Sequence, residues 1–152
     1  MTVELDDGTR IHESRIRLQY TWWIGRTGSN FYEEIRKNRK IWGIKCPFCR
    51  VVYVPPKENC PKCFSKMHEW VELGNTGTLT TYTVVNYAIP GIQPENPPFA
   101  LGIIILDRAN TGLVHLLGEI DLTKIRVGMR VQAVFNEKPQ GDLLDIKYFK
   151  PI

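Results

Sequence analysis

Hydrophobic and polar residues alternate along much of the second half of this chain, and the alternation predicts β-structure there. Five strand-like segments, separated by turn-forming residues, cover residues 77–88, 99–107, 113–120, 129–136 and 143–150. In the last two segments we expect one set of alternate side chains to point inward: Val131, Ala133 and Phe135, then Leu144, Ile146 and Tyr148. A short helical turn within 121–128 favours a five-stranded OB-fold barrel over a small immunoglobulin-like or SH3-like barrel.

One amphipathic helix is predicted nearer the N-terminus. Phe31 and Ile35 lie four residues apart, which places them on one face of a helix. Thr27 or Ser29 is the expected cap at its start, and the helix is expected to run to about Arg39.

Shorter elements flank this helix. Residues 1–19 are charged and irregular, which is typical of a short hairpin around residues 6–8 or of an extended arm. The aromatic run at residues 20–23 is expected to be either core or an interface patch. Three short strands are expected downstream of the helix, at residues 41–45, 51–54 and 68–73.

Four cysteines, the only ones in the chain, form two Cys-x-x-Cys pairs with ten residues between them: Cys46, Cys49, Cys60 and Cys63. Two such turns can direct four thiolates at one centre, so the spacing predicts a tetrahedral metal site. Structural zinc is the expected ion, because four protein ligands leave no position for a substrate. A rubredoxin-type iron, two disulfides and a redox pair are the alternatives. Glycine often follows the second cysteine of such a turn, whereas this chain has Arg50 and Phe64, which predicts a strained or altered turn.

Together these elements predict a mainly β protein with an N-terminal helix, a rubredoxin-like zinc ribbon and a five-stranded OB-fold barrel. We expect three parts: an arm and helix at 1–40, the ribbon at 41–74 and the barrel at 75–152. No segment approaches the ~20 apolar residues of a membrane span. Residues 1–19 lack the apolar core of a secretory signal, so we expect a cytoplasmic protein.

Positive charge is concentrated around the cysteines. Residues 36–66 contain nine lysines and arginines against one acidic residue, Glu58, so this stretch carries +8 and the rest of the chain −4, for a net charge of +4. Such a lobe suits phosphates or an acidic protein surface, and a solvated basic face is the alternative.

The first two barrel strands have the opposite character. Between Gly77 and Leu106 the chain has no lysine or arginine, and Glu95 is the one charged residue. This region includes a loop, residues 90–98, with four prolines, which predicts a stiff wall beside a ligand or a rigid surface loop. A phosphate-bearing ligand with a thin, weakly polar arm would match both regions, and coenzyme A has that shape.

The sequence shows no catalytic constellation. His12, His68 and His115 are scattered, and no nucleotide-binding or nucleophile-elbow motif occurs. The cysteines are assigned to the metal, which leaves no nucleophile for thioester chemistry. We therefore expect a protein that is not an enzyme.

The order of these parts resembles the small OB-fold proteins with an N-terminal zinc ribbon that accompany thiolases and related acyl-CoA enzymes in archaea and bacteria. The resemblance runs from the aromatic helix to Phe149. It rests on the ribbon cysteines and on softer motifs: Gly77-Thr78-Leu79, Tyr82-Thr83-Val84-Val85, the proline loop, Leu116-Leu117-Gly118 and Val127-Gly128-Met129-Arg130-Val131. It implies a non-catalytic scaffold that bridges acetoacetyl-CoA thiolase and hydroxymethylglutaryl-CoA synthase of the mevalonate pathway. Such a scaffold helps to hold coenzyme A while the acyl group moves between the two enzymes.

Charge and placement then provide candidate ligand contacts. The nucleotide phosphates of coenzyme A or an acyl-CoA are expected near Lys45 and Arg50. The pantetheine arm is expected to lie along Tyr87, Pro90, Gly91, Phe99 and Gly118. The alternative function is single-stranded nucleic-acid binding by a zinc-ribbon OB-fold protein. Such proteins place cations beside stacking aromatics on the barrel, whereas residues 77–106 contain no lysine or arginine.

Overall fold

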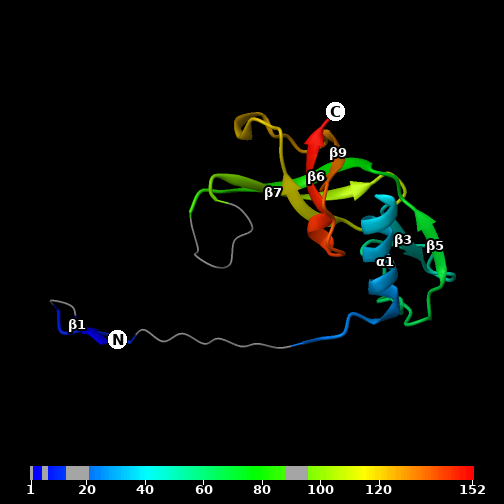
Figure 1. Cartoon of the computed structure of the whole chain (residues 1–152), viewed down its shortest axis with the longest axis horizontal. Helices are drawn as coiled ribbons and strands as arrows, with labels where there is room; N and C mark the ends of the chain where they lie inside the picture. The colour runs from blue at the N-terminus through cyan, green and yellow to red at the C-terminus, as the bar shows by residue number, and fades with distance from the viewer. Residues whose placement is uncertain (1, 5–6, 13–20, 88–95) are drawn as a thin grey trace.

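A computed structural model describes residues 2–4, 7–12, 21–87 and 96–152 of the chain, and every structural statement below concerns those residues. They form one α-helix, ten β-strands and two short 3-10 helices (Figure 1). In chain order the elements are β1 (Thr2–Glu4), β2 (Arg10–His12), α1 (Gly25–Asn38), β3 (Trp42–Lys45), β4 (Val52–Tyr53), β5 (Glu69–Glu72), β6 (Thr76–Val85), β7 (Phe99–Leu106), β8 (Leu113–Leu117), η1 (Leu122–Lys124), β9 (Arg130–Phe135), η2 (Leu143–Asp145) and β10 (Ile146–Pro151).

The last five strands close into a barrel in the order β10-β8-β7-β6-β9. Strand β6 belongs to two ladders, since residues 76–78 pair with β9 and residues 77–85 pair with β7. A register shift between Leu79 and Thr81 lies where β6 leaves one ladder for the other, and such an irregularity bends a strand. The short helix η1 lies between β8 and β9, as predicted. The mainly β fold with a five-stranded barrel is therefore confirmed.

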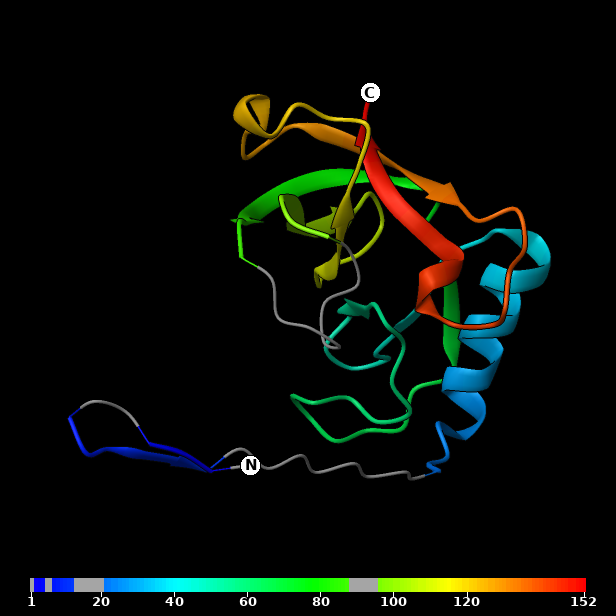
Figure 2. The ribbon, with the colours of Figure 1, turned by 60° about the vertical axis from the view of Figure 1, so that its left-hand side comes forward.

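The barrel closes through a narrow seam between β8 and β10. These two strands run parallel, and their ladder contains a single residue pair, Leu117 with Phe149. One further hydrogen bond extends it, from Gly118 N–H to the carbonyl of Phe149 at 2.9 Å. By contrast, β9 and β10 are paired over five positions. Figure 2 shows β10 crossing the barrel on this side.

The inward faces of the last two strands were predicted with unequal success. In β9, Val131 and Ala133 are buried, as expected. In the fifth segment Ile146 is buried as expected, but Leu144 lies in η2 and is 56% exposed, so the expectation for Leu144 is wrong. A register shift between Ile146 and Tyr148 then places Phe149, not Tyr148, fully in the core.

The expected helix forms, but it begins earlier than predicted. Helix α1 starts at Gly25, and Ile24 precedes it without any side-chain cap. Ser29 lies inside the helix, where its hydroxyl donates to the carbonyl of Gly25 at 2.8 Å. The helix ends at Asn38, and the left-handed backbone of Arg39 after it (φ 53°) lets the N–H of Lys40 turn back and donate to the carbonyl of Glu34 at 3.3 Å. The predicted end is therefore correct and the predicted caps are wrong.

Of the two predictions for the N-terminal residues, the hairpin is the one that the structure shows. Strands β1 and β2 are antiparallel, with Val3 opposite Ile11. The N–H of Thr9 donates to the Asp7 carboxylate at 2.9 Å in the turn between them.

The ribbon forms a three-stranded sheet, β4-β3-β5, that is fastened to the barrel through the turn after β7. The N–H of Val52 donates to the side-chain oxygen of Asn110 at 2.8 Å, and the N–H of Asn110 donates back to the carbonyl of Val52 at 2.9 Å. The hydroxyl of Thr111 accepts from the N–H of Val54 at 2.8 Å and donates to its carbonyl at 3.1 Å. This turn thus binds β4 almost as a neighbouring strand would.

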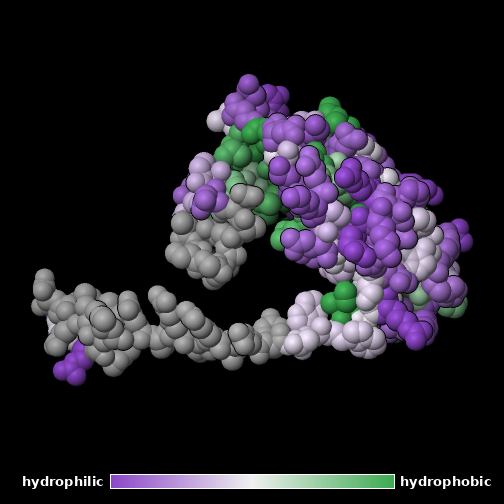
Figure 3. Space-filling view, in the orientation of Figure 1, coloured by the Kyte–Doolittle hydropathy of each residue, from purple (hydrophilic) through white to green (hydrophobic). Residues whose placement is uncertain are grey.

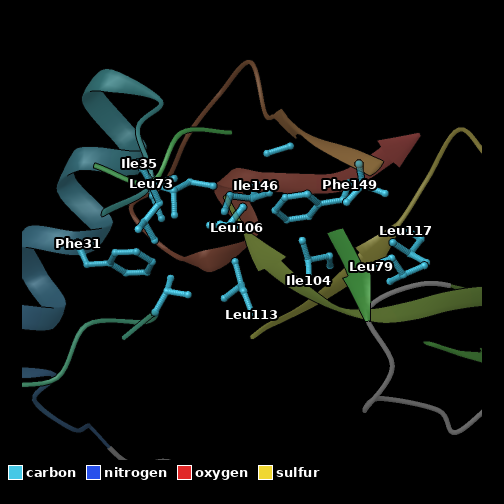
Figure 4. Close-up of a cluster of buried hydrophobic side chains, with 14 of the residues drawn as sticks. Phe31, Ile35, Leu73, Leu79, Ile104, Leu106, Leu113, Leu117, Ile146 and Phe149 are labelled. Carbon is cyan, nitrogen blue, oxygen red and sulfur yellow. The ribbon is translucent and has the colours of Figure 1, made fainter. Parts of the chain in front are cut away.

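One hydrophobic cluster runs through the helix, the ribbon and the barrel (Figure 4). Phe31 and Ile35 of α1 lie at one end of it and Leu117 at the other, with Ile146 and Phe149 between them. Ile41, Val52, Val54 and Leu73 from the ribbon belong to the same cluster. Burial of these side chains is the main force that holds the parts together.

Candidate metal centre and ligand groove

The two cysteine turns have the same backbone hydrogen bonds. In the first, the N–H of Cys46 donates to the carbonyl of Val51 at 2.9 Å, and the N–H of Arg50 donates to the carbonyl of Cys46 at 3.0 Å. In the second, the N–H of Cys60 donates to the carbonyl of Ser65 at 2.9 Å, and the N–H of Phe64 donates to the carbonyl of Cys60 at 2.9 Å. Each turn is therefore a knuckle that directs two thiols to the same side.

The four sulfur atoms come together at one point. All Sγ atoms of Cys46, Cys49, Cys60 and Cys63 lie within 4.8 Å of one another. The Cys46–Cys63 pair is 3.5 Å apart and the Cys49–Cys60 pair 4.0 Å. A tetrahedron with metal–sulfur bonds of ~2.3 Å has edges of about 3.8 Å. A disulfide would need ~2.05 Å, and all four cysteines are free. The quartet is therefore positioned to bind a metal ion.

Two hydroxyl groups border the sulfur cluster, and sequence analysis did not identify either. The Ser65 hydroxyl lies 3.4 Å from the sulfur of Cys46 and 3.1 Å from that of Cys63. The Tyr53 hydroxyl lies 3.5 Å from the sulfur of Cys60. The hydroxyl groups of Ser65 and Tyr53 can donate hydrogen bonds to the cysteine thiolates and so orient them toward a bound ion.

These contacts alter the acidity of the thiols in opposite directions. Burial raises the pKa of Cys46, but hydrogen bonds from Ser65 and from the Cys49 N–H outweigh it and lower the pKa to about 6. The neighbouring Cys63 sulfur and burial raise the pKa of Cys49 to about 12. Negative charge on one sulfur thus opposes ionisation of the next, and a bound cation removes this conflict.

The positions after the second cysteines adopt the backbone that glycine favours. Arg50 has a φ of 61° and Phe64 a φ of 59°. The knuckle geometry is therefore kept at the cost of local strain, which confirms one of the two outcomes predicted from the missing glycines. The side chain of Phe64 is 81% exposed, so it gains no packing in the chain that would offset this strain.

Acidic residues from outside the basic stretch neutralise part of its charge. Lys45 forms an ion pair with Glu69 at 2.9 Å, and Lys40 forms one with Glu72 at 2.9 Å. Arg50 has no ion pair with any described residue. The two predicted phosphate contacts therefore differ, because Lys45 has a carboxylate partner.

A groove of about 290 Å³ opens at the β8–β10 seam and brings together two of the predicted ligand contacts, Phe99 and Gly118. Tyr87, which is 64% exposed, does not line this groove, nor do Lys45 and Arg50. Pro90 and Gly91 lie outside the described residues. The groove is lined by Asn96, Pro98, Phe99, Ala100, Leu116, Leu117, Gly118, Ile120, Leu122 and Tyr148.

Gly118 shapes one corner of the groove by lacking a side chain. A Cβ there would lie 2.4 Å from the ring of Tyr148, so only glycine lets that ring lie against the backbone. The Tyr148 hydroxyl donates to the Glu119 carboxylate at 2.5 Å, and Lys150 pairs with the same carboxylate at 3.1 Å. Sequence analysis missed Tyr148 as a groove residue, because it placed the side chain in the core.

The surface around the barrel is unevenly hydrophobic. Figure 3 shows hydrophobic surface on the barrel near β7, whereas the surface over α1 is mostly hydrophilic. Ile103, Ile105 and Val114 contribute exposed apolar side chains on β7 and β8. Among the described residues, no helix combines the length and the apolar composition that a membrane-spanning helix requires.

His115 is a packing residue in this structure. It is buried, its Nδ1 accepts from the N–H of Leu116 at 2.9 Å, and its Nε2 lies 3.3 Å from the carbonyl of Leu143. Burial lowers the pKa of His115, so the ring is neutral at pH 7.

A closed five-stranded barrel preceded by a four-cysteine ribbon defines this molecule as a zinc-ribbon OB-fold protein. Two domain families match it consecutively: "ChsH2, rubredoxin-like zinc ribbon domain" at residues 34–69 and "ChsH2, C-terminal OB-fold domain" at residues 70–136. A DUF35 domain-containing scaffold protein of Methanocaldococcus jannaschii is 34% identical over 129 residues, which cover 80% of this chain and 88% of that protein. The chain belongs to the DUF35 family.

Other relatives are larger proteins or parts of complexes. A protein of Thermomonospora curvata described as "Probable enoyl-CoA hydratase alpha subunit" is 29% identical over 101 residues, which are 66% of this chain but 31% of that protein. A chain from the Ltp2-ChsH2(DUF35) aldolase structure superposes with a TM-score of 0.62 and 26% identity, covering 84% of this chain and 96% of that chain. A DUF35 protein of unknown function from Sulfolobus solfataricus has the same fold, with a TM-score of 0.58, 24% identity and coverage of 72% and 78%.

Proposed function

We propose that this protein is a non-catalytic scaffold subunit that bridges acetoacetyl-CoA thiolase and hydroxymethylglutaryl-CoA synthase in the cytoplasm and helps to hold coenzyme A between them. Its relative in Methanocaldococcus jannaschii is described as a scaffold protein. Two further relatives are named as part of an enoyl-CoA hydratase and of an aldolase assembly. Two of these names thus refer to enzymes with more than one component, and one of the two refers to an acyl-CoA substrate, which supports a role as a subunit of an acyl-CoA enzyme complex.

The groove beside Phe99 and Gly118 is the observation that carries the ligand part of the proposal. Its lining residues are mostly apolar by type. Of the strands beside it, β7 and β8 contain no lysine or arginine, whereas β10 contributes Tyr148 with Lys147 and Lys150 close by in the sequence. A pantetheine arm, thin and uncharged with two amides, suits such a surface better than a phosphate backbone does. Lys45 and Arg50 are the proposed contacts for the nucleotide phosphates, and Tyr87, Pro90 and Gly91 are proposed to continue the path of the arm.

The metal centre is proposed to be a structural zinc site. Its four thiolates would complete the tetrahedral coordination of the ion. The ion would then hold the two knuckles together, and no coordination position would be open for a substrate. Ser65 and Tyr53 would donate to the ligands and fix their orientation.

Purification of the tagged full-length protein from its source cells, with nuclease treatment, tests the proposal. We expect a thiolase or hydroxymethylglutaryl-CoA synthase in near-stoichiometric amount and coenzyme A in the eluate. Lys45→Glu combined with Arg50→Glu should lower the retained coenzyme A at least fivefold. Lys57→Glu, a charge reversal elsewhere on the ribbon, is the matched control and should leave it unchanged.

Nucleic-acid binding is the competing function, and exposed aromatic side chains favour it. Phe48 and Phe64 are 78% and 81% exposed on the two knuckles, near basic residues. Recovery of RNA-associated proteins that disappear after nuclease treatment, with no acyl-CoA enzyme, would support this function and overturn the scaffold proposal.

A further inference from the structure

A second hollow lies between α1 and the ribbon sheet, apart from the metal centre and the barrel groove. It has a volume of about 400 Å³ and is lined by Asn30, Glu33 and Glu34 of α1, Trp42 of β3 and Trp70 of β5. Figure 1 shows α1 lying alongside β3 and β5. The volume falls within the range of small-ligand pockets, ~300–1,000 Å³.

The fold brings these five side chains together from two directions. Asn30, Glu33 and Glu34 are three and four residues apart, so they share one face of α1. In the β3–β5 ladder, Trp42 is opposite Glu72 and Ile44 is opposite Trp70. The two indoles are therefore diagonal neighbours on one face of the sheet.

One polar atom of these side chains, on Trp42, lacks a hydrogen-bond partner. Its indole Nε1 is buried and has no hydrogen-bond partner. Buried indole N–H groups nearly always have an acceptor, so an orphaned donor calls for one that the chain itself does not supply. Because this atom is buried, an acceptor oxygen of a ligand would reach it only after the Trp42 ring turns toward the hollow.

The charge of the hollow restricts its ligand further. Glu33 is neutralised by Arg36 at 2.9 Å and Lys37 at 2.8 Å, and these partners lower its pKa to about 2. Glu34 accepts from the amide of Asn38 at 2.9 Å but has no ion pair with any described residue. An uncompensated carboxylate beside two indoles attracts a cation and repels phosphates.

We propose that this hollow binds a lysine or arginine side chain of a partner protein. The cation would lie against the indoles of Trp42 and Trp70 and pair with Glu34, and a main-chain carbonyl next to the basic residue would accept from Trp42 Nε1. A peptide segment supplies both groups at once, whereas a simple amine supplies only the cation. The inference rests on the proposed function only for the identity of the partner, which would be the bound condensing enzyme.

Indole resonances of the ¹⁵N-labelled, metal-loaded full-length protein test this site. The chain has four tryptophans, and Trp22 and Trp23, which are 67% and 83% exposed, serve as internal controls. We expect the peptides acetyl-Gly-Lys-Gly-amide and acetyl-Gly-Arg-Gly-amide to shift the Trp42 and Trp70 signals with millimolar affinity. The norleucine analogue, which lacks the cation, should shift neither signal.

Two variants assign the contacts. Glu34→Gln keeps the shape and removes the charge, and it should weaken peptide binding at least fivefold. Glu137→Gln, a carboxylate outside the hollow, is the matched control and should not change binding. Trp42→Phe removes the indole N–H and should also weaken binding; its dispersed amide spectrum would confirm that it folds.

Three results would overturn the inference: no shift at Trp42 and Trp70, an equal shift with the norleucine peptide, or equal affinity of the Glu34→Gln variant. The assay contains neither coenzyme A nor a condensing enzyme. Its failure would therefore leave the proposed scaffold function standing, and the failure of that function would leave the peptide site standing.

Discussion

Phe64 adopts the left-handed backbone that the second cysteine knuckle requires, and this conformation costs the residue conformational free energy. Its φ of 59° is in the left-handed region, where side chains other than glycine lose about 1–2 kcal/mol. Its side chain is 81% exposed and recovers little of this loss by packing. A position with this combination is suboptimal for stability, so an exposed phenylalanine there is more readily explained by contact with a partner than by folding.

Replacing Phe64 with glycine should stabilise the metal-loaded protein by about 0.5–1 kcal/mol. The gain is the relieved strain less the extra backbone entropy of glycine in the unfolded chain, which is about 0.5–1 kcal/mol. Phe48→Gly is the control, since Phe48 is similarly exposed but is not a left-handed residue. Urea unfolding should move the midpoints of the two variants in opposite directions, and a decrease for both would contradict the strain argument.

At the residue scale, the sequence predicts the metal ligands because their spacing alone determines that they converge. It does not predict Ser65 and Tyr53, since a serine or a tyrosine near a cysteine is common and only the folded turn decides whether the hydroxyl meets a sulfur. Phe99 and Gly118, two of the residues expected along the pantetheine arm, both line the groove. Lys45 was expected to be available for phosphates, but its ion pair with Glu69 depends on the β3–β5 register, which the sequence does not specify. The ligand role of these residues stays a prediction.

At the scale of elements, alternation identified all five barrel strands, but it failed where the ladder is irregular. A register shift in β10 exchanges Phe149 for Tyr148 in the core, and nothing in the local sequence marks that shift. The start of α1 was missed for a similar reason. Thr27 and Ser29 are good caps by type, yet the helix already begins at Gly25, and the Ser29 hydroxyl donates to the carbonyl of Gly25 inside the helix.

The turn after β7, with Asn110 and Thr111, holds the ribbon against the barrel through its hydrogen bonds to β4 and the residue after it. Asn110→Ala should destabilise the protein by about 1–3 kcal/mol, because the part-buried N–H of Val52 loses its acceptor. The variant should also give larger amide shifts in β4 than in β9. Asn38→Ala removes an exposed side-chain hydrogen bond and should cost less than about 0.5 kcal/mol. Chemical denaturation of both variants checks this, and equal costs would show that the turn does not fasten the ribbon.

At the scale of the whole molecule, helix, ribbon and barrel share one hydrophobic cluster although the sequence divides into modules. The turn at 74–77 and the change in charge predict a boundary, and the division into residues 1–40, 41–74 and 75–152 stays a prediction. Contacts between modules cannot be deduced from hydrophobic periodicity, because periodicity tells which face is buried but not against what. Thus the class of fold was predictable, while the way in which Val52 and Leu73 join the barrel core was not.

Metal removal should therefore weaken the barrel as well as the ribbon. Without the ion, the two knuckles are no longer linked by metal–sulfur bonds. The ribbon side chains in the shared hydrophobic cluster are then less well fixed. The barrel should then melt at a lower temperature, by about 2–4 °C for each kcal/mol lost in a chain of this size. Circular dichroism melts before and after chelation, with Cys60→Ser as a second metal-deficient form, measure the change. A barrel that melts at the same temperature in all three forms would show that the modules are energetically independent.

The closing seam of the barrel has a consequence for anything that enters the groove. The β8–β10 ladder is a single pair of residues, Leu117 and Phe149, and Leu117 forms part of the groove wall together with the adjoining Gly118 and Tyr148. This ladder is the shortest in the barrel, and an occupant of the groove would contact both of the strands that it joins. If a ligand occupies the groove, the Gly118 amide should exchange its hydrogen more slowly, because the bond that it donates to Phe149 closes this seam.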